Sequence, residues 1–167
     1  FGYGNWPSAN ARYLIGQETS LVCSPQLRDS LALRCPQDLQ RATLLQHIEV
    51  PLAWHDWLQA HQCDTTGSRF GPGFNLYSLI IRAAVSGFGV AIVPTCLVED
   101  ELQAGSLVEP LGDRYQSPLG YYLCAPSARA NLSAYKLVSA WLEHCCSHAE
   151  PAAAPQRDCI FCKTASD

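Results

Sequence analysis

Two adjoining stretches decide the fold: FNLYSLIIRAAVSGFGVAIVP (residues 74–94) and LVEDELQAGSLVEP (residues 97–110). The first stretch opens with apolar residues at the spacing that places them on one face of an α-helix. Asn75 is the predicted N-cap of this helix, and Gly87 is its predicted C-terminal stop. The residues on the predicted buried face are Leu76, Leu79, Ile80, Ala83 and Ala84.

A short apolar run then follows the helix at residues 90–94 and is typical of a buried strand. Thr95 is expected to cap a next helix that ends at Gly105, and Leu107-Val108 is expected to return as a strand. Helices that alternate with strands across short connections predict an α/β fold with parallel pairing.

Outside these stretches the local patterns are shorter. Residues 1–12 are rich in Gly, Pro, Asn and Ser and predict a loop. An extended segment is expected from Tyr13 to Cys23, with a break near Gly16 and an end at Ser24-Pro25. Short helices are expected at residues 36–43 and around residues 54–61, and a strand at residues 119–126. A last helix, capped by Asn131 or Ser133, is predicted to share one face among Tyr135, Val138, Trp141, Leu142 and Cys145.

Composition excludes several classes of protein. The chain has 167 residues, 48% of them hydrophobic and 16% charged, which predicts a globular chain with a core. Its net charge is −4 and it contains no basic run, so it lacks the clustered cations that sequence-independent binding of nucleic acid requires. No apolar stretch approaches 18 residues, and the start does not resemble a signal peptide.

The chain contains nine Cys and no Met, not even at position 1. An odd number of irregularly spaced cysteines favours free thiols in a reducing cytoplasm over a disulfide framework. The missing Met suggests that the sequence begins inside a longer reading frame. We therefore expect a cytoplasmic protein.

Several motifs occur here in a single order: GYGNW (2–6), SLVCSP (20–25), WHDW (54–57), the two central stretches, YYLCAP (121–126) and SAWL (139–142). This order resembles the effector-binding domain of LysR-type transcriptional regulators, within the subgroup of glycine-cleavage and β-lactamase activators. The resemblance covers roughly residues 1–145, and its specific part is the central helix–strand–helix–strand unit.

The resemblance implies the α/β fold of type 2 periplasmic binding proteins, with two lobes and a small-molecule effector in the cleft. It implies a partial first lobe from residues 1–22 and 117–148 and a complete second lobe from residues 23–116. The Pro- and Ala-rich sequence after His148 predicts a linker or disordered tail from residues 149–167. The winged helix-turn-helix, the linker helix and the opening half of the first lobe would all precede Phe1. The remaining first lobe would then expose an apolar strand edge and an apolar helix face.

The same resemblance implies where the effector binds. The start of the central helix and the end of the neighbouring strand would contact it, at an edge of the sheet where α/β proteins commonly bind ligands. We expected the helix to start after a Gly-Pro-Gly turn at residues 71–73 and to present free N–H groups there. The predicted effector contacts are Tyr3, Gly4, Asn5, Phe74, Asn75, Leu76, Tyr77, Val93, Pro94 and Tyr122.

We therefore expect a sensing domain of a transcription regulator that is not an enzyme and needs no cofactor. Its expected partners are a small-molecule effector (an amino acid, an organic acid or a cell-wall fragment), a second copy in a homodimer or tetramer, and DNA through the missing N-terminal domain. No membrane partner is expected. The alternative from another class is a solute-binding protein of a transporter, which shares the fold.

Other chemical signals are weaker. Trp54 and Trp57 could stack on a ligand, but their helical spacing favours core packing. His47, His55 and His61 lack the spacing of metal ligands, and no nucleophile elbow, P-loop or dinucleotide turn is present. Near the end of the chain, zinc or redox chemistry could use Cys145, Cys146, Cys159 and Cys162. The string DCIFCK also resembles the opening of histidine-triad nucleotide hydrolases, but the triad itself is missing.

Overall fold

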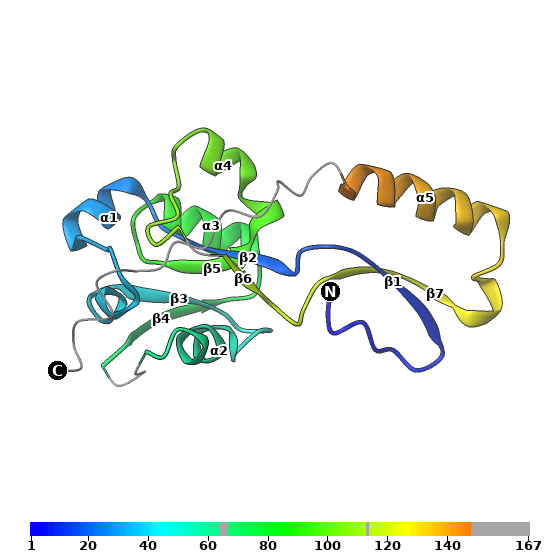
Figure 1. The fold of residues 1–167 in the computed structure, drawn as a ribbon, viewed down its shortest axis with the longest axis horizontal. Helices are drawn as coiled ribbons and strands as arrows, with labels where there is room; N and C mark the ends of the chain where they lie inside the picture. Colours follow the sequence, from blue (N-terminus) through cyan, green and yellow to red (C-terminus); the bar gives the residue numbers. More distant parts are fainter. Residues whose placement is uncertain (64–66, 113, 148–167) are drawn as a thin grey trace. The chain divides into compact units, whose positions relative to one another are not determined.

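The computed structural model describes residues 1–63, 67–112 and 114–147 (Figure 1). The described residues form two compact units, one from Ser20–Tyr115 and one from Phe1–Thr19 together with Gln116–Ser147. Strands β2 (Glu18–Val22) and β6 (Arg114–Gln116) each run through a point of division.

The Ser20–Tyr115 unit is a layered α/β structure. Its elements in chain order are α1 (Pro25–Leu31), the 3₁₀ helix η1 (Pro36–Arg41), β3 (Thr43–His47), α2 (Ala53–Ala60), β4 (Arg69–Phe74), α3 (Tyr77–Val85), β5 (Ala91–Pro94), the 3₁₀ helix η2 (Thr95–Leu97) and α4 (Glu99–Gln103). Strand β3 pairs in parallel with β4 on one side and with Val90 on the other. The remaining strands have the order β5-β2-β6, and Cys23 pairs antiparallel with Val108.

Side chains that point alternately to the two faces of these strands divide the core into two layers. Leu44 belongs to the cluster that contains Trp54, Trp57 and Leu58 of α2, whereas Leu45 belongs to the cluster that contains Ile80 and Ala84 of α3. Leu21 and Val22 of β2 divide between the same two clusters. Because successive side chains of a strand point to opposite faces, one sheet can bury α2 on one face and α3 on the other. Figure 1 shows these helices on opposite sides of β3 and β4.

A glycine permits the close approach between β3 and the chain that enters β5. A Cβ at position 89 would lie 2.3 Å from the carbonyl oxygen of Thr43. The next residue, Val90, donates its N–H to that same carbonyl at 2.8 Å and accepts from the Leu45 N–H at 2.8 Å. A side chain at position 89 would therefore force these hydrogen-bonded segments apart.

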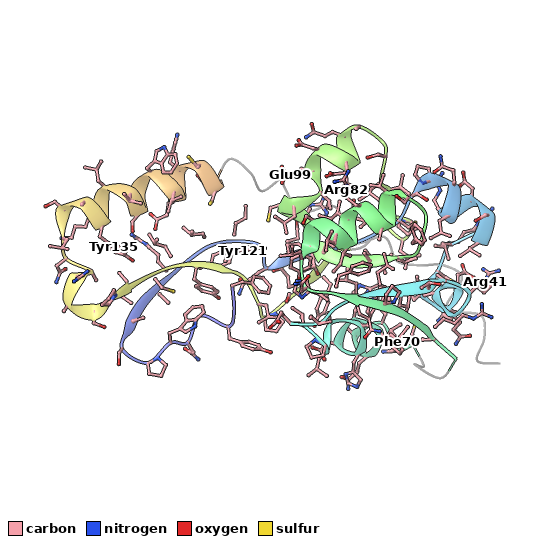
Figure 2. The ribbon with its side chains drawn as sticks, turned by 180° about the vertical axis from the view of Figure 1, so that it is seen from behind. Arg41, Phe70, Arg82, Glu99, Tyr121 and Tyr135 are labelled. Carbon is pink, nitrogen blue, oxygen red and sulfur yellow. The ribbon has the colours of Figure 1, made fainter. Side chains whose placement is uncertain are left out.

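The second unit is built on an antiparallel strand pair. Strand β1 (Ala9–Ile15) pairs with β7 (Tyr121–Pro126), with Tyr13 opposite Tyr122. The 3₁₀ helix η3 (Ser127–Arg129) leads to α5 (Ser133–Ser147), which packs against β1. An ion pair joins Arg12 of β1 to Glu143 of α5. Tyr135 lies on the side of α5 that faces the strands (Figure 2).

Several sequence expectations are confirmed. The extended segment, the helix around residues 54–61, the strand near residues 90–94, the strand at 119–126 and the last helix all occur. The helix expected at residues 36–43 is a 3₁₀ helix that ends at Arg41, because Thr43 already begins β3. The start is not all loop, because β1 begins at Ala9. Helix α1 was missed, although Ser24 accepts a hydrogen bond from the Leu27 N–H and Pro25 stands at the first helical position.

The central unit needs three corrections. Thr95 does not cap a helix by its side chain: it opens η2, and the N-cap of α4 is Val98. Leu107-Val108 forms only a single bridge, to Cys23, and that bridge is antiparallel where parallel pairing was expected. The buried face of α3 is formed by Ile80, Ile81 and Ala84, while Leu76 and Leu79 are exposed.

The predicted face of α5 is also partly wrong. Ser139 is its one fully buried residue among those described, and Val138 and Trp141 are exposed. The exposed apolar residues on and just before this helix are Leu132, Leu137, Val138 and Trp141. An exposed apolar helix face in this part of the chain agrees with the expectation from the sequence.

Candidate functional site

Within the Ser20–Tyr115 unit, the candidate contacts lie where two parallel strands end. Strand β3 ends at His47 and β4 ends at Phe74, and these two residues are paired in the register. Helix α3 begins three residues later, at Tyr77. Because the strands are parallel, both carboxyl ends and the start of α3 meet at one edge of the sheet, the edge at which α/β proteins commonly bind ligands.

The start of α3 differs from the expected one. Asn75 is not the N-cap: that position is Leu76, which has an extended conformation and makes no side-chain cap bond. Residues 71–73 are not a turn, because Gly71, Pro72 and Gly73 lie within β4. The glycines serve close packing instead, since a Cβ at Gly71 would lie 2.6 Å from Thr43 and one at Gly73 would lie 2.6 Å from Ile48.

Accessibility separates the candidates of this unit. Asn75 and Leu76 are exposed, and Phe74 and Tyr77 are half-buried. Val93 and Pro94 are fully buried in the core, so their side chains are not presented to solvent in this structure. A ligand at this edge would therefore meet the side chains of Asn75 and Leu76 first.

His47 lies at the same edge, although the sequence had singled it out only as a poor metal ligand. Its ring centroid lies 4.3 Å from that of Tyr77, with the planes tilted by 41°. The Glu49 N–H donates to His47 Nδ1 at 3.2 Å. Burial lowers the pKa of His47, an effect that the nearby Glu49 opposes. The signal that could have found it is positional, because it is the last residue of a strand.

The other predicted contacts belong to the unit that contains β1 and β7. Gly4 lies against Tyr122, because a Cβ at position 4 would come within 2.7 Å of the tyrosine ring. Tyr122 also packs edge-on against Trp6 and Tyr13. Its hydroxyl accepts a hydrogen bond from Gln17 Nε2 at 3.4 Å. Tyr3 and Asn5 are exposed.

The neighbouring Tyr121 has an aromatic partner of its own. Tyr121, at the start of β7 (Figure 2), packs against Phe1 with ring centroids 4.9 Å apart and planes tilted by 52°. Successive side chains of β7 point to opposite faces, so Tyr122 lies against Gly4 while Tyr121 lies against Phe1.

A polar network that sequence reasoning missed lies inside the Ser20–Tyr115 unit. Ser20 is fully buried and donates its single hydroxyl proton to Glu109 Oε1 at 2.6 Å. Thr95 Oγ1 lies 2.9 Å from Ser20 Oγ and must be the donor in that pair. Arg114 Nε forms an ion pair with the same Glu109 oxygen at 3.2 Å. The network joins β2, η2 and β6, and it satisfies hydroxyls that burial would otherwise leave unpaired.

Metal chemistry has limited support in the described part of the chain. No group of three or more His, Cys, Asp or Glu side chains that could hold a metal ion occurs there. Cys145 is exposed and Cys146 is half-buried on α5. Cys159, Cys162 and the expected 149–167 linker lie outside the described residues. Among the helices that the structure describes, none has the length and apolar character needed to span a membrane.

Comparison with known proteins decides the family. The model of the LysR substrate binding domain matches residues 1–146. The chain belongs to this family. The glycine cleavage system transcriptional activator of Escherichia coli K12 is 29% identical over 143 residues, which are 85% of this chain and 47% of that protein. The transcriptional activator AmpR of Providencia stuartii is 31% identical over 142 residues, with the same coverage.

Solved structures give the same result for this LysR substrate-binding domain. The effector domain of AmpR from Pseudomonas aeruginosa has a TM-score of 0.74 at 25% identity, over 88% of this chain and 70% of that one. The AmpR effector-binding domain of Citrobacter freundii has a TM-score of 0.73 at 26% identity, over 88% and 72%. The predicted periplasmic-binding-protein-like α/β fold is therefore confirmed. The chain spans about half the length of the curated relatives it matches.

Proposed function

We propose that this LysR substrate-binding domain senses a small-molecule effector and that it controls transcription as part of a longer DNA-binding regulator. The match of residues 1–146 to the family carries the proposal. Its curated relatives at 29–31% identity are transcriptional activators, so the solute-binding alternative is not favoured. In this role the domain binds and signals without catalysing a reaction, in the cytoplasm where the regulated DNA lies.

The proposed effector contacts follow the sequence analysis. In the Ser20–Tyr115 unit, the exposed Asn75 and Leu76 at the start of α3 are the most accessible of them. In the other unit, Tyr122 supplies a phenol hydroxyl beside Gly4. The full proposed set is Tyr3, Gly4, Asn5, Phe74, Asn75, Leu76, Tyr77, Val93, Pro94 and Tyr122.

Regulation requires that the effector bind two states of the regulator with different affinity, since equal affinity shifts no equilibrium. We propose that these states differ in lobe closure or in how two copies pack, and that the regulator works as a homodimer or tetramer. We also propose that residues 1–22 and 117–148 form a partial first lobe and that residues 23–116 form a complete second lobe. DNA would be read by a segment that this sequence does not contain.

The test is a melting-temperature screen of the 167-residue chain with one probe from each proposed class: glycine, acetate and muramyl dipeptide. A ligand that binds only the folded state raises the melting temperature by mass action. We expect one class to raise it, and Asn75→Ala and Tyr122→Phe to reduce that rise. If all three probes leave the melting temperature unchanged at 10 mM (on the order of the weakest useful affinity), the proposal fails.

A further inference from the structure

We propose that His47 is a further effector contact, and that its Nε2–H donates a hydrogen bond to an acceptor oxygen of the effector, a carboxylate or an amide carbonyl. The inference rests on the proposed function and adds a residue and a ligand chemistry to it. All the residues that carry it lie within the Ser20–Tyr115 unit.

The first observation is the position of His47. It is the last residue of β3, and it pairs with Phe74, the last residue of the parallel strand β4. Its ring packs against Tyr77, the first residue of α3. His47 thus contacts the elements on both sides of the proposed contacts Asn75 and Leu76, at the carboxyl edge of the sheet.

The second observation is the state of the imidazole ring. A backbone N–H of Glu49 points at Nδ1, so Nδ1 accepts a hydrogen bond and cannot carry the proton. The neutral ring must then be protonated at Nε2. Among residues 1–63, 67–112 and 114–147, no side chain or backbone group accepts from this nitrogen. The turn after β3 therefore fixes which nitrogen of this half-buried ring is the donor.

The third observation is what surrounds this donor. Ile48 directly follows His47, and Leu76 lies two residues after its strand partner Phe74. Both are exposed apolar residues, 54% and 55% accessible. Asn75 adds an exposed amide. The turn itself is held by the Val50 N–H, which donates to the His47 carbonyl at 3.0 Å, and by the Ile48 N–H, which donates to the Phe74 carbonyl at 2.9 Å. A small molecule with an acceptor oxygen and a short apolar part fits these neighbours.

The competing explanation is that His47 only packs against Tyr77. Two substitutions separate it from the proposal. His47→Phe keeps an aromatic ring against Tyr77 but removes the donor. His47→Gln loses the ring but places an amide N–H close to the position of Nε2. Packing alone predicts that Phe preserves binding better than Gln, whereas the proposal predicts the opposite order.

The experiment titrates glycine, acetate and muramyl dipeptide into the 167-residue chain by calorimetry, for wild type and both variants. His55→Phe, an exposed histidine on α2, is the matched control. Circular dichroism checks that each variant is folded. For the probe that wild type binds, we expect His47→Phe to weaken binding about tenfold, His47→Gln to stay within about threefold, and His55→Phe to change nothing. Histidine ¹⁵N NMR should show the Nε2–H tautomer in the free protein.

Three results would overturn the inference. If folded His47→Phe binds the probe with wild-type affinity, His47 is not a hydrogen-bond donor to it, while the proposed function still stands. An Nδ1–H tautomer in the free protein would lead to the same conclusion. If wild type binds none of the three probes, the proposed function fails, and the assignment of His47 fails with it.

Discussion

The carbonyl oxygen of Thr43 lies 2.3 Å from the place that a Cβ at Gly89 would occupy. Thr43 begins β3 and Gly89 immediately precedes Val90, which bonds to that same carbonyl. Parallel strands can lie side by side here only because residue 89 has no side chain. The same strand, four residues on, carries His47 to the candidate site, so this contact supports the geometry of that edge.

Gly89→Ala is therefore expected to lower the free energy of unfolding by about 1–3 kcal/mol, the usual cost of overpacking a tight site. Denaturant unfolding measures it. Gly105→Ala is the control, since nothing lies within 4 Å of a Cβ there and only its positive φ of 70° is strained. That control should cost about 1 kcal/mol. Equal, small effects of both substitutions would show that the β3 contact is loose.

Two tryptophans should differ sharply when truncated. Trp57 is 1% exposed in the core cluster that contains Trp54 and Leu58 of α2, whereas Trp141 on α5 is 62% exposed. Trp57→Ala should cost about 3–5 kcal/mol, because it removes buried area and leaves a cavity. Trp141→Ala should change stability by less than about 1 kcal/mol. Urea unfolding followed by circular dichroism compares them, and a large loss for Trp141→Ala would mean that this face is covered.

The network around Ser20 predicts a cost larger than the size of the side chain suggests. Ser20→Ala removes the hydroxyl that joins Thr95 to Glu109 and leaves polar groups of both residues without that partner. The expected loss is about 1–3 kcal/mol. Ser30→Ala on the exposed side of α1 should change stability by no more than about 0.5 kcal/mol. If the two variants unfold at the same denaturant concentration, the network contributes nothing measurable.

His47 should make stability depend on pH in one direction. Burial lowers its pKa in the folded chain, so the unfolded chain binds a proton more readily. Its contribution to stability is therefore complete above the ordinary pKa of about 6.5 and is lost as the pH falls below that value. The ring packs on Tyr77, and the nearby Glu49 carboxylate opposes the shift without reversing it.

The measurement is the melting temperature of wild type and His47→Gln between pH 8 and pH 5. Wild type should lose more stability on acidification than the variant, because the variant has no imidazole to protonate. If wild type instead gains melting temperature relative to His47→Gln as the pH falls, the lowered pKa of His47 would be contradicted.

The thiols should react according to their environment. Burial raises the pKa of Cys23 to about 11, and the nearby Arg28 only partly opposes this. At pH 8 its reactive thiolate is therefore scarce as well as inaccessible. Iodoacetamide should label the exposed Cys124 and Cys145 in the folded chain and label Cys23 only after denaturation. Mass spectrometry of the digested protein measures the order in which the cysteines are labelled. Early labelling of Cys23 would show that the core around it opens readily.

Much of the fold follows from local patterns, and its failures have physical causes. The strand at Ala91–Pro94 was predictable because it is a continuous apolar run, and the helix at Ala53–Ala60 because it presents one unambiguous apolar face. Helix α3 is apolar at several consecutive positions, so periodicity could not choose between Leu79 and Ile81; the sheet beneath the helix makes that choice. On α5, packing against β1 buries Ser139 in preference to Trp141.

The site was predictable to a smaller extent. The family motif located Asn75 and Leu76 near a strand end, but not the true N-cap of α3. His47 was invisible as a candidate because its role depends on a β3–β4 register and on a turn that presents the Glu49 N–H to its ring. Neither feature leaves a signal in local spacing.

The most direct test of the central claim is to map where a probe binds. Amide NMR spectra of the ¹⁵N-labelled chain would be recorded during titration with whichever of glycine, acetate and muramyl dipeptide raises the melting temperature. Effector sensing at the carboxyl edge predicts that the largest shifts in the Ser20–Tyr115 unit fall at residues 47–49 and 74–77. Shifts in that unit confined to α1 or α2, with those residues unmoved, would contradict it.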